Sequence, residues 1–121
     1  IPDLVITSSA LRARSTAELA MEAGRWASRL SVEPRLYGAH ASTILELAQA
    51  LPDGLASVLF AGHEPTCSTA VGLLTGRVSV RFPTGAMARV DFEGDSWKQI
   101  RAEKGRLIWL LPPRLLERVA G

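Results

Sequence analysis

Four apolar residues, Val58–Ala61, run directly into the sequence Gly-His-Glu-Pro-Thr at 62–66. An unbroken apolar run of this length is typical of a short strand that is buried on both faces in a parallel sheet. Gly62 permits a tight turn and Pro65 suits the first helical position, so we predict a helix that begins near Thr66. Ligands of open α/β sheets bind at the carboxyl ends of the strands, where helix N-termini attract anions. His63 is therefore a candidate anion-binding residue.

The start of the chain contains a second strand followed by a helix. Asp3–Ser8 is rich in β-branched residues and predicts a strand. Ser8 or Ser9 then suits the N-cap of a long helix, for which we predict the range Ala10–Leu30. This second unit has the same order as the first, which favours two parallel strands side by side.

The helical pattern separates two arginines that stand two positions apart. At about 100° per residue, Arg12 falls at the centre of a largely apolar stripe, whereas Arg14 falls on the other side with Glu18. We predict that Arg14 pairs with Glu18 in solvent and that Arg12 faces the core. A guanidinium that faces the core needs a partner, and because the stripe has no acidic residue, a bound anion or a distant carboxylate must supply it. The stripe comprises Arg12, Thr16, Leu19, Ala23, Trp26 and Leu30.

The rest of the chain continues the alternation of helices and strands. The predicted elements are an extended connector at Ser31–Leu36, a helix from Thr43 to about Leu51 with a capping-box pattern, strands at Val78–Phe82 and Met87–Phe92, an extended piece at Trp97–Ile100, a strand at Leu107–Leu111 and a helix at Arg114–Ala120. This order predicts an α/β fold, a three-layer sandwich with helices on both faces of a mixed, mostly parallel central sheet.

The composition excludes several classes of protein. The chain has 121 residues, of which 47% are hydrophobic, as expected for a single domain over residues 1–121. Its formal net charge is +2, without a long run of like charge, so we expect no nucleic-acid and no membrane partner. The single cysteine, Cys67, excludes an internal disulfide and fits a reducing, cytoplasmic compartment.

The two strand-to-helix turns should open on the same edge of the sheet. Arg12 and His63 would then converge there, beside the N-termini of two helices. A fixed fork of charged donors next to an imidazole, with backbone N–H groups around it, is suited to binding phosphate.

Three segments resemble motifs of the histidine phosphatase superfamily, which has the phosphoglycerate-mutase-like fold. Residues 7–18 resemble its second phosphate-pocket motif, residues 62–65 its second-histidine motif, and residues 82–90 the segment that follows. The three occur in the family's order, and the chain most resembles the short SixA-type phosphohistidine phosphatases. The resemblance implies that Arg12 binds the phosphoryl group and that His63 contacts it and stabilises its charge. Ser8 and Glu64 join these two as candidate substrate-binding residues.

One motif of the superfamily is absent from this sequence. The family's nucleophile is a histidine in an Arg-His-Gly triplet at the end of a first strand, and the chain contains no such triplet. His40 is the other histidine, and it precedes a helix in a polar loop. We expect the domain's first strand to lie upstream, with this chain alone inactive; the alternative is that the chain has lost its chemistry.

The resemblance implies a two-step phosphatase reaction. The upstream histidine would take the phosphoryl group from phosphohistidine on a protein, or from a small phosphoester, and water would then hydrolyse the intermediate. Arg12 and His63 would stabilise charge without a metal or other cofactor, and Glu64 is a candidate proton donor. Only one short helix is predicted between the two motifs, so we expect an open, shallow site.

Simpler interpretations of the same residues remain open. His63 could be an ordinary turn residue, and Arg12 could extend past the helix end into solvent. Cys67 fits a small buried apolar residue, and His63-Glu64 lacks the following histidine of a zinc motif. A non-catalytic module that binds phosphate or a phosphoprotein on the same fold is the alternative to an enzyme.

Overall fold

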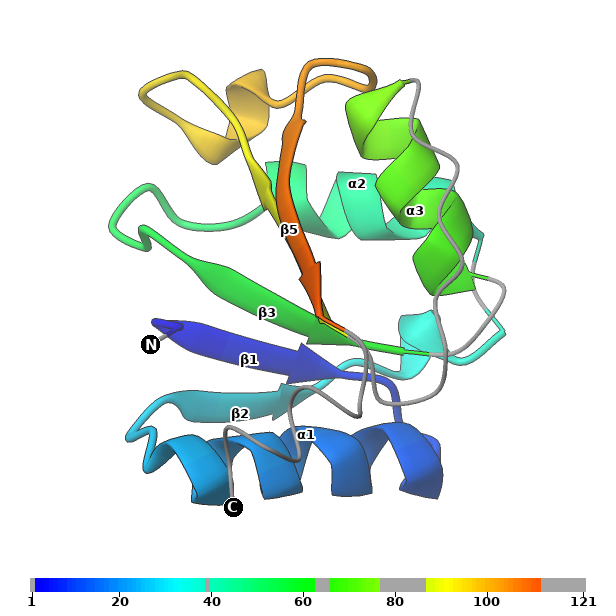
Figure 1. The fold of residues 1–121 in the computed structure, drawn as a ribbon, viewed down its shortest axis with the longest axis vertical. Coiled ribbons are helices and arrows are strands. Elements are labelled where there is room, and N and C mark those ends of the chain that lie inside the picture. The colour runs from blue at the N-terminus through cyan, green and yellow to red at the C-terminus, as the bar shows by residue number, and fades with distance from the viewer. Residues whose placement is uncertain (1, 39, 63–65, 77–86, 112–121) are drawn as a thin grey trace.

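A computed structural model describes residues 2–38, 40–62, 66–76 and 87–111 of the 121-residue chain. The predictions for Val78–Phe82 and for the terminal helix Arg114–Ala120 fall outside these residues. Within the described ranges the α/β prediction is confirmed, since helices alternate with strands and three strands form a parallel sheet (Figure 1). No described helix is both long and apolar enough to cross a membrane.

The parallel sheet has the first strand at its centre. β1 (Leu4–Thr7) lies between β2 (Arg29–Val32) and β3 (Val58–Ala61) and runs parallel to both. Thr7 is paired in register with the last residue of each neighbour, so all three strands end together. Figure 1 shows the three arrowheads at one side, which we call the carboxyl edge.

Helices cover both sides of this sheet (Figure 1). Leu4 and Ile6 point to one side, where they form a hydrophobic cluster with residues of α2 (Ala41–Gln49) and α3 (Thr66–Thr75). α1 (Leu11–Gly24) lies along the other side. Side chains alternate along a strand, so Val5 and Thr7 point to the opposite side and face α1. The buried members of the cluster are Leu4, Ile6, Leu36, Ala41, Ile44, Leu47 and Ala70.

A separate antiparallel hairpin follows α3. β4 (Met87–Asp91) pairs with β5 (Arg106–Leu111), with an irregularity in register between Arg89 and Val90. The described strands are therefore parallel in the first part of the chain and antiparallel in the second. The described strands nevertheless form two sheets rather than the single mixed sheet that we expected, because no hydrogen-bonded ladder joins β3 to β4 in these ranges.

The hairpin is tied to the C-terminal end of α3 by backbone hydrogen bonds. Glu103 N–H donates to the Leu73 carbonyl at 2.9 Å, and Gly105 N–H donates to the Leu74 carbonyl at 2.8 Å. Carbonyls of a last helical turn lack partners inside the helix, so these two bonds satisfy groups that would otherwise be unpaired. The chain just before β5 thus acts as the C-cap of α3.

The first helix is shorter than predicted. α1 ends at Gly24 because Arg25 adopts a left-handed conformation, with φ of 53°. Trp26 N–H then donates back to the Met21 carbonyl at 2.9 Å, which closes the helix end. The residues beyond it form β2, so part of the predicted helix and of the predicted connector is in fact an edge strand.

Four smaller predictions also need correction. The N-cap of α1 is Ala10, rather than Ser8 or Ser9, and α2 begins at Ala41 rather than Thr43. The four residues of β3 are half-buried rather than fully buried. Trp97–Gln99 forms a short 3₁₀ turn, η2, where we predicted an extended piece. In contrast, the predicted start of α3 and the predicted range of β5 agree with the structure to within one residue.

Candidate phosphate-binding site

Ser8 is fixed in the turn between β1 and α1. It is fully buried, and its N–H donates to the Ala61 carbonyl at 2.9 Å, which extends the pairing of β1 with β3 by one residue. Its hydroxyl oxygen accepts a hydrogen bond from Ala10 N–H at 3.3 Å. The carbonyl of Ser8 accepts from the Thr7 hydroxyl at 3.0 Å. These bonds hold the turn to the ends of β1 and β3.

Replacing Ser8 by alanine is expected to destabilise the fold by about 1 kcal/mol, because the amide of Ala10 loses its acceptor. Ser9 is the matched control, since it stands next in the chain and is exposed. Ser9→Ala should change stability by less than about 0.5 kcal/mol. The urea midpoint of each variant measures this, and equal midpoints would refute the structural role of the Ser8 hydroxyl.

Arg12 lies in the first turn of α1, and the prediction that it faces the core is wrong. Its side chain is exposed. The helix instead packs on the sheet through Ala13 and Ala17, while Leu19 of the predicted stripe is 64% exposed. Small side chains let the helix backbone come close to the strands, and this close contact sets the rotation of the helix.

The exposure of Arg12 changes the argument for anion binding. Within the described ranges, no carboxylate pairs with its guanidinium and no hydrogen bond to it is formed. Arg14, by contrast, forms the predicted solvent-exposed ion pair with Glu18 at 2.9 Å. Arg12 stands exposed at the carboxyl edge, in the first turn of α1, where a ligand can reach it. The case for anion binding therefore rests on this position and not on a buried charge that needs a partner.

His63 and Glu64 fall outside the described residues, so the predicted meeting of Arg12 with His63 stays a prediction. The residues on either side of 63–65 are described. Ala61, at the end of β3, is bonded to Ser8, and α3 begins at Thr66. Neighbouring strands lie about 4.8 Å apart, so the chain leaves β3 close to the Ser8 turn.

A third turn at the carboxyl edge was missed by sequence reasoning. β2 ends at Val32, and Glu33 N–H donates to the Thr7 carbonyl at 2.8 Å. The carboxylate of Glu33 then accepts from the backbone N–H and from Nε of Arg35, both at 3.1 Å, and caps the 3₁₀ turn η1 (Pro34–Leu36). These backbone and side-chain hydrogen bonds lower the pKa of Glu33. A glutamate directly before proline was the available signal, since Pro suits the first position of a helical turn.

The ion pair between Glu33 and Arg35 matters for the charge of this edge. A carboxylate with a lowered pKa stays ionised, and it is neutralised by its own neighbour. It therefore does not compensate Arg12. Among the described residues, no group of three or more His, Cys, Asp or Glu side chains could hold a metal ion.

A cavity of about 320 Å³ lies away from this site, at the amino ends of the strands. Leu4 and Arg29, the first residues of β1 and β2, line it together with Pro52 and Leu55. Asp3 also lines it, but its carboxylate accepts hydrogen bonds from two backbone N–H groups of the loop before β3, at 2.7 and 3.2 Å. Asp3 thus braces this loop, and the candidate site is at the opposite edge.

Comparison with known sequences gives related proteins that cover most of the chain. No family model matches it. An uncharacterized protein of Mycobacterium leprae is 31% identical over 120 residues, which cover 91% of this chain and 71% of that protein. An uncharacterized protein of Mycobacterium tuberculosis is 32% identical over 124 residues, with 93% and 74% covered.

Comparison with solved structures indicates the family of the chain. A structure of the protein histidine phosphatase SixA in complex with tungstate matches with a TM-score of 0.79 and 28% identity, over 96% of this chain and 72% of that one. A SixA-type structure from Agrobacterium tumefaciens matches with a TM-score of 0.76 and 27% identity, over 93% and 69%. One from Nakamurella multipartitia, 24% identical with a TM-score of 0.72, supports the fold. The chain therefore belongs to the histidine phosphatase superfamily, as a SixA-like member.

Proposed function

We propose that the protein is a phosphatase that acts through a phosphohistidine intermediate, with Arg12 and His63 binding the transferred phosphoryl group. The observation that carries the proposal is the position of Arg12. Its guanidinium stands at the carboxyl edge, in the first turn of α1, without an ion-pair partner in the described part of the chain. The histidine phosphatase structure with bound tungstate, an oxyanion, supports the same kind of ligand.

The proposed reaction proceeds in two displacements. A histidine nitrogen attacks the phosphorus atom, a new N–P bond forms, and the bond from phosphorus to the leaving group breaks. Water then attacks the phosphohistidine, and inorganic phosphate is released. Arg12 and His63 bind the equatorial oxygens, where charge gathers in both transition states. Glu64 would give a proton to the leaving group in the first step.

We propose that the nucleophilic histidine lies upstream of Ile1, on a strand that ends in Arg-His-Gly. The arrangement of the two sheets supports this. β3 and β4 each have one hydrogen-bonded neighbour among the described strands, so each has an edge that a further strand could use. This chain alone would then bind anions without turnover, because the nucleophile and the phosphate-binding residues lie on different parts of the full protein.

The test is hydrolysis by the full-length gene product. We expect it to release phosphate from p-nitrophenyl phosphate or from free phosphohistidine, and to form an acid-labile phosphoenzyme in a single turnover. Replacing the histidine of the upstream triplet by asparagine should abolish both signals, whereas His63→Asn should lower the rate by about 10²–10³-fold. An upstream sequence without the triplet, or a protein that binds phosphate without turnover, would favour the alternative of a phosphate-binding or phosphoprotein-binding module.

A further inference from the structure

The cavity at the amino ends of the strands offers a second place for a ligand. It lies where β1 and β2 begin, and Figure 1 shows this side of the sheet opposite the arrowheads. Its volume is about 320 Å³, whereas small-molecule sites in proteins span roughly 300–1,000 Å³. The cavity therefore suits a ligand at the small end of that range. Its lining residues are Asp3, Leu4, Arg29, Pro52 and Leu55.

The apolar part of the cavity is continuous with the hydrophobic cluster. Leu4 is a buried member of the cluster, and Leu55 packs against it. Arg29 pairs in register with Leu4, and paired residues of neighbouring parallel strands project to the same face of a sheet. An arginine side chain therefore lines the cavity together with apolar side chains of the cluster.

The loop that carries Pro52 and Leu55 is held in place by contacts within the fold. The carboxylate of Asp3 accepts hydrogen bonds from two backbone N–H groups of this loop, at 2.7 and 3.2 Å. The indole N–H of Trp97 donates to the Leu55 carbonyl at 2.7 Å, and Leu55 N–H donates to the Pro52 carbonyl at 3.2 Å. A ligand would therefore meet a wall that is already ordered, which lowers the entropy cost of binding.

Two opposite charges line the cavity without pairing with each other. No ion pair joins Asp3 to Arg29, and the Arg29 guanidinium forms no hydrogen bond within the described part of the chain. Both bonds to Asp3 are made with its Oδ2, so its Oδ1 can accept from a ligand. Asp53 is the other charged residue of the loop, and it accepts a hydrogen bond from the Ser96 hydroxyl at 2.7 Å. The cavity thus presents one anionic and one cationic group beside an apolar surface.

This combination favours a ligand that carries both charges. A simple anion on Arg29 would bring negative charge towards Asp3, and a simple cation on Asp3 would bring positive charge towards Arg29. A zwitterion instead forms a charge-assisted hydrogen bond with each group. We propose that the cavity binds a free α-amino acid with an aliphatic side chain. Its carboxylate binds Arg29, its ammonium group binds Asp3, and its hydrocarbon contacts the apolar lining residues.

The proposed amino acid site is separate from the phosphate site. Leu4 and Thr7, at the two ends of β1, lie about 10 Å apart, since a strand rises by about 3.3 Å per residue. The two ligands would therefore bind at opposite edges of the parallel sheet. Binding of an amino acid does not depend on the proposed phosphatase activity.

The test is an NMR chemical-shift titration of the full-length gene product with L-leucine. We expect saturable binding, with the largest shifts at the backbone amides of Leu4 and Leu55. Arg29→Gln should weaken binding at least about tenfold, because it removes the partner of the carboxylate. This variant should keep the fold, since Arg29 is exposed and its side chain forms no hydrogen bond to the described residues.

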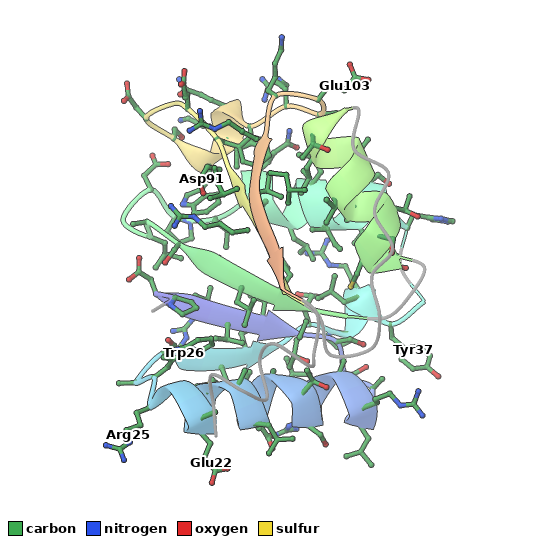
Figure 2. All side chains as sticks on the ribbon, in the orientation of Figure 1. Glu22, Arg25, Trp26, Tyr37, Asp91 and Glu103 are labelled. Carbon is green, nitrogen blue, oxygen red and sulfur yellow. The ribbon has the colours of Figure 1, made fainter. Side chains whose placement is uncertain are left out.

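Arg25→Gln is the matched control. It removes the same charge four residues earlier in the sequence, at a position that does not line the cavity. Figure 2 shows the side chain of Arg25 reaching outward beyond the end of α1. This variant should bind L-leucine as the wild type does.

Two analogues of L-leucine test the requirement for both charges. Isocaproate lacks the ammonium group and isoamylamine lacks the carboxylate, so each should bind at least about tenfold more weakly than L-leucine. Asp3→Asn should weaken the binding of L-leucine but not that of isocaproate. The amide oxygen of asparagine can still accept the backbone hydrogen bonds that hold the loop.

Three results would overturn the proposed amino acid site. They are an absence of saturable binding by the wild type up to about 10 mM L-leucine, equal affinity in Arg29→Gln and Arg25→Gln, and binding of isocaproate as tight as that of L-leucine. Because the titration uses no phosphoryl substrate, failure of the phosphatase proposal would leave each of these results unchanged.

Discussion

Replacing Gly105 by alanine is expected to destabilise the protein by about 2–4 kcal/mol, because the added carbon has no space. A Cβ at this position would lie 2.6 Å from Cγ1 of Val90, 2.8 Å from Cζ of Phe92 and 2.8 Å from the backbone carbonyl oxygen of Leu74. The last of these atoms cannot rotate away, and it is the acceptor of the Gly105 N–H. The clash therefore also breaks the bond that caps α3. The melting temperature should fall by roughly 10 °C.

Gly54→Ala is the matched control for this prediction. A Cβ at Gly54 would meet no heavy atom within 4 Å, and the residue lies in the exposed loop before β3. The control should melt within about 2 °C of the wild type, since it changes only the entropy of the unfolded chain. If circular dichroism gives similar melting temperatures for the two variants, the prediction that a Cβ at position 105 has no space is wrong.

The second large effect concerns ligand binding. Arg12→Ala is expected to abolish the thermal stabilisation that phosphate, vanadate or tungstate gives to the protein, because the guanidinium supplies the charged donors of the proposed site. At an anion concentration of about 100 times Kd, the wild type should gain about 2.7 kcal/mol, and the variant should gain almost nothing. Without anion, the two proteins should be equally stable, since Arg12 is exposed and has no ion-pair partner among the described residues.

Arg14→Ala controls for the general effect of removing a positive charge. Arg14 stands on the same helix and is also exposed, but it is paired with Glu18. Its loss should cost less than about 1 kcal/mol and should leave the stabilisation by anions in place. Thermal shift measurements over a series of anion concentrations decide the matter. Equal losses in the two variants, or no stabilisation of the wild type, would contradict a phosphate site at Arg12.

The sequence predicted helices and strands correctly where a local pattern is compatible with only one kind of element. The run Val58–Ala61 predicted a parallel strand, and the residues after it predicted a helix that begins near Thr66, because a strong apolar run followed by Gly and Pro leaves few alternatives. The motifs around Arg12 and His63 also indicated the correct family. These predictions concern local conformation and residue order, which short segments encode by themselves.

The errors arose where tertiary packing decides. The phase of α1 was predicted from its large apolar residues, but Ala13 and Ala17 make the contact with the sheet, and Leu19 lies in solvent. β2 was missed because an edge strand with Arg29 and Ser31 in it has no strong apolar pattern, and its pairing with β1 forms it. The Glu33 cap was missed with it. Such contacts join segments that are distant in sequence, so they cannot be predicted from a local pattern.

The capping of α3 has a mechanical consequence. α3 is a helix of ten residues, about 15 Å long, held at its C-terminal end by Glu103 and Gly105, while its N-terminal residue, Thr66, stands three positions after His63 in the sequence. A tilt of about 4° at the held end would displace the opposite end by about 1 Å, an error that can cost an active site a hundredfold in rate. The hairpin therefore helps to set the position of the N-terminal end of α3. Under the proposed function, substitutions in the hairpin should change the rate of phosphate release although they lie far from Arg12.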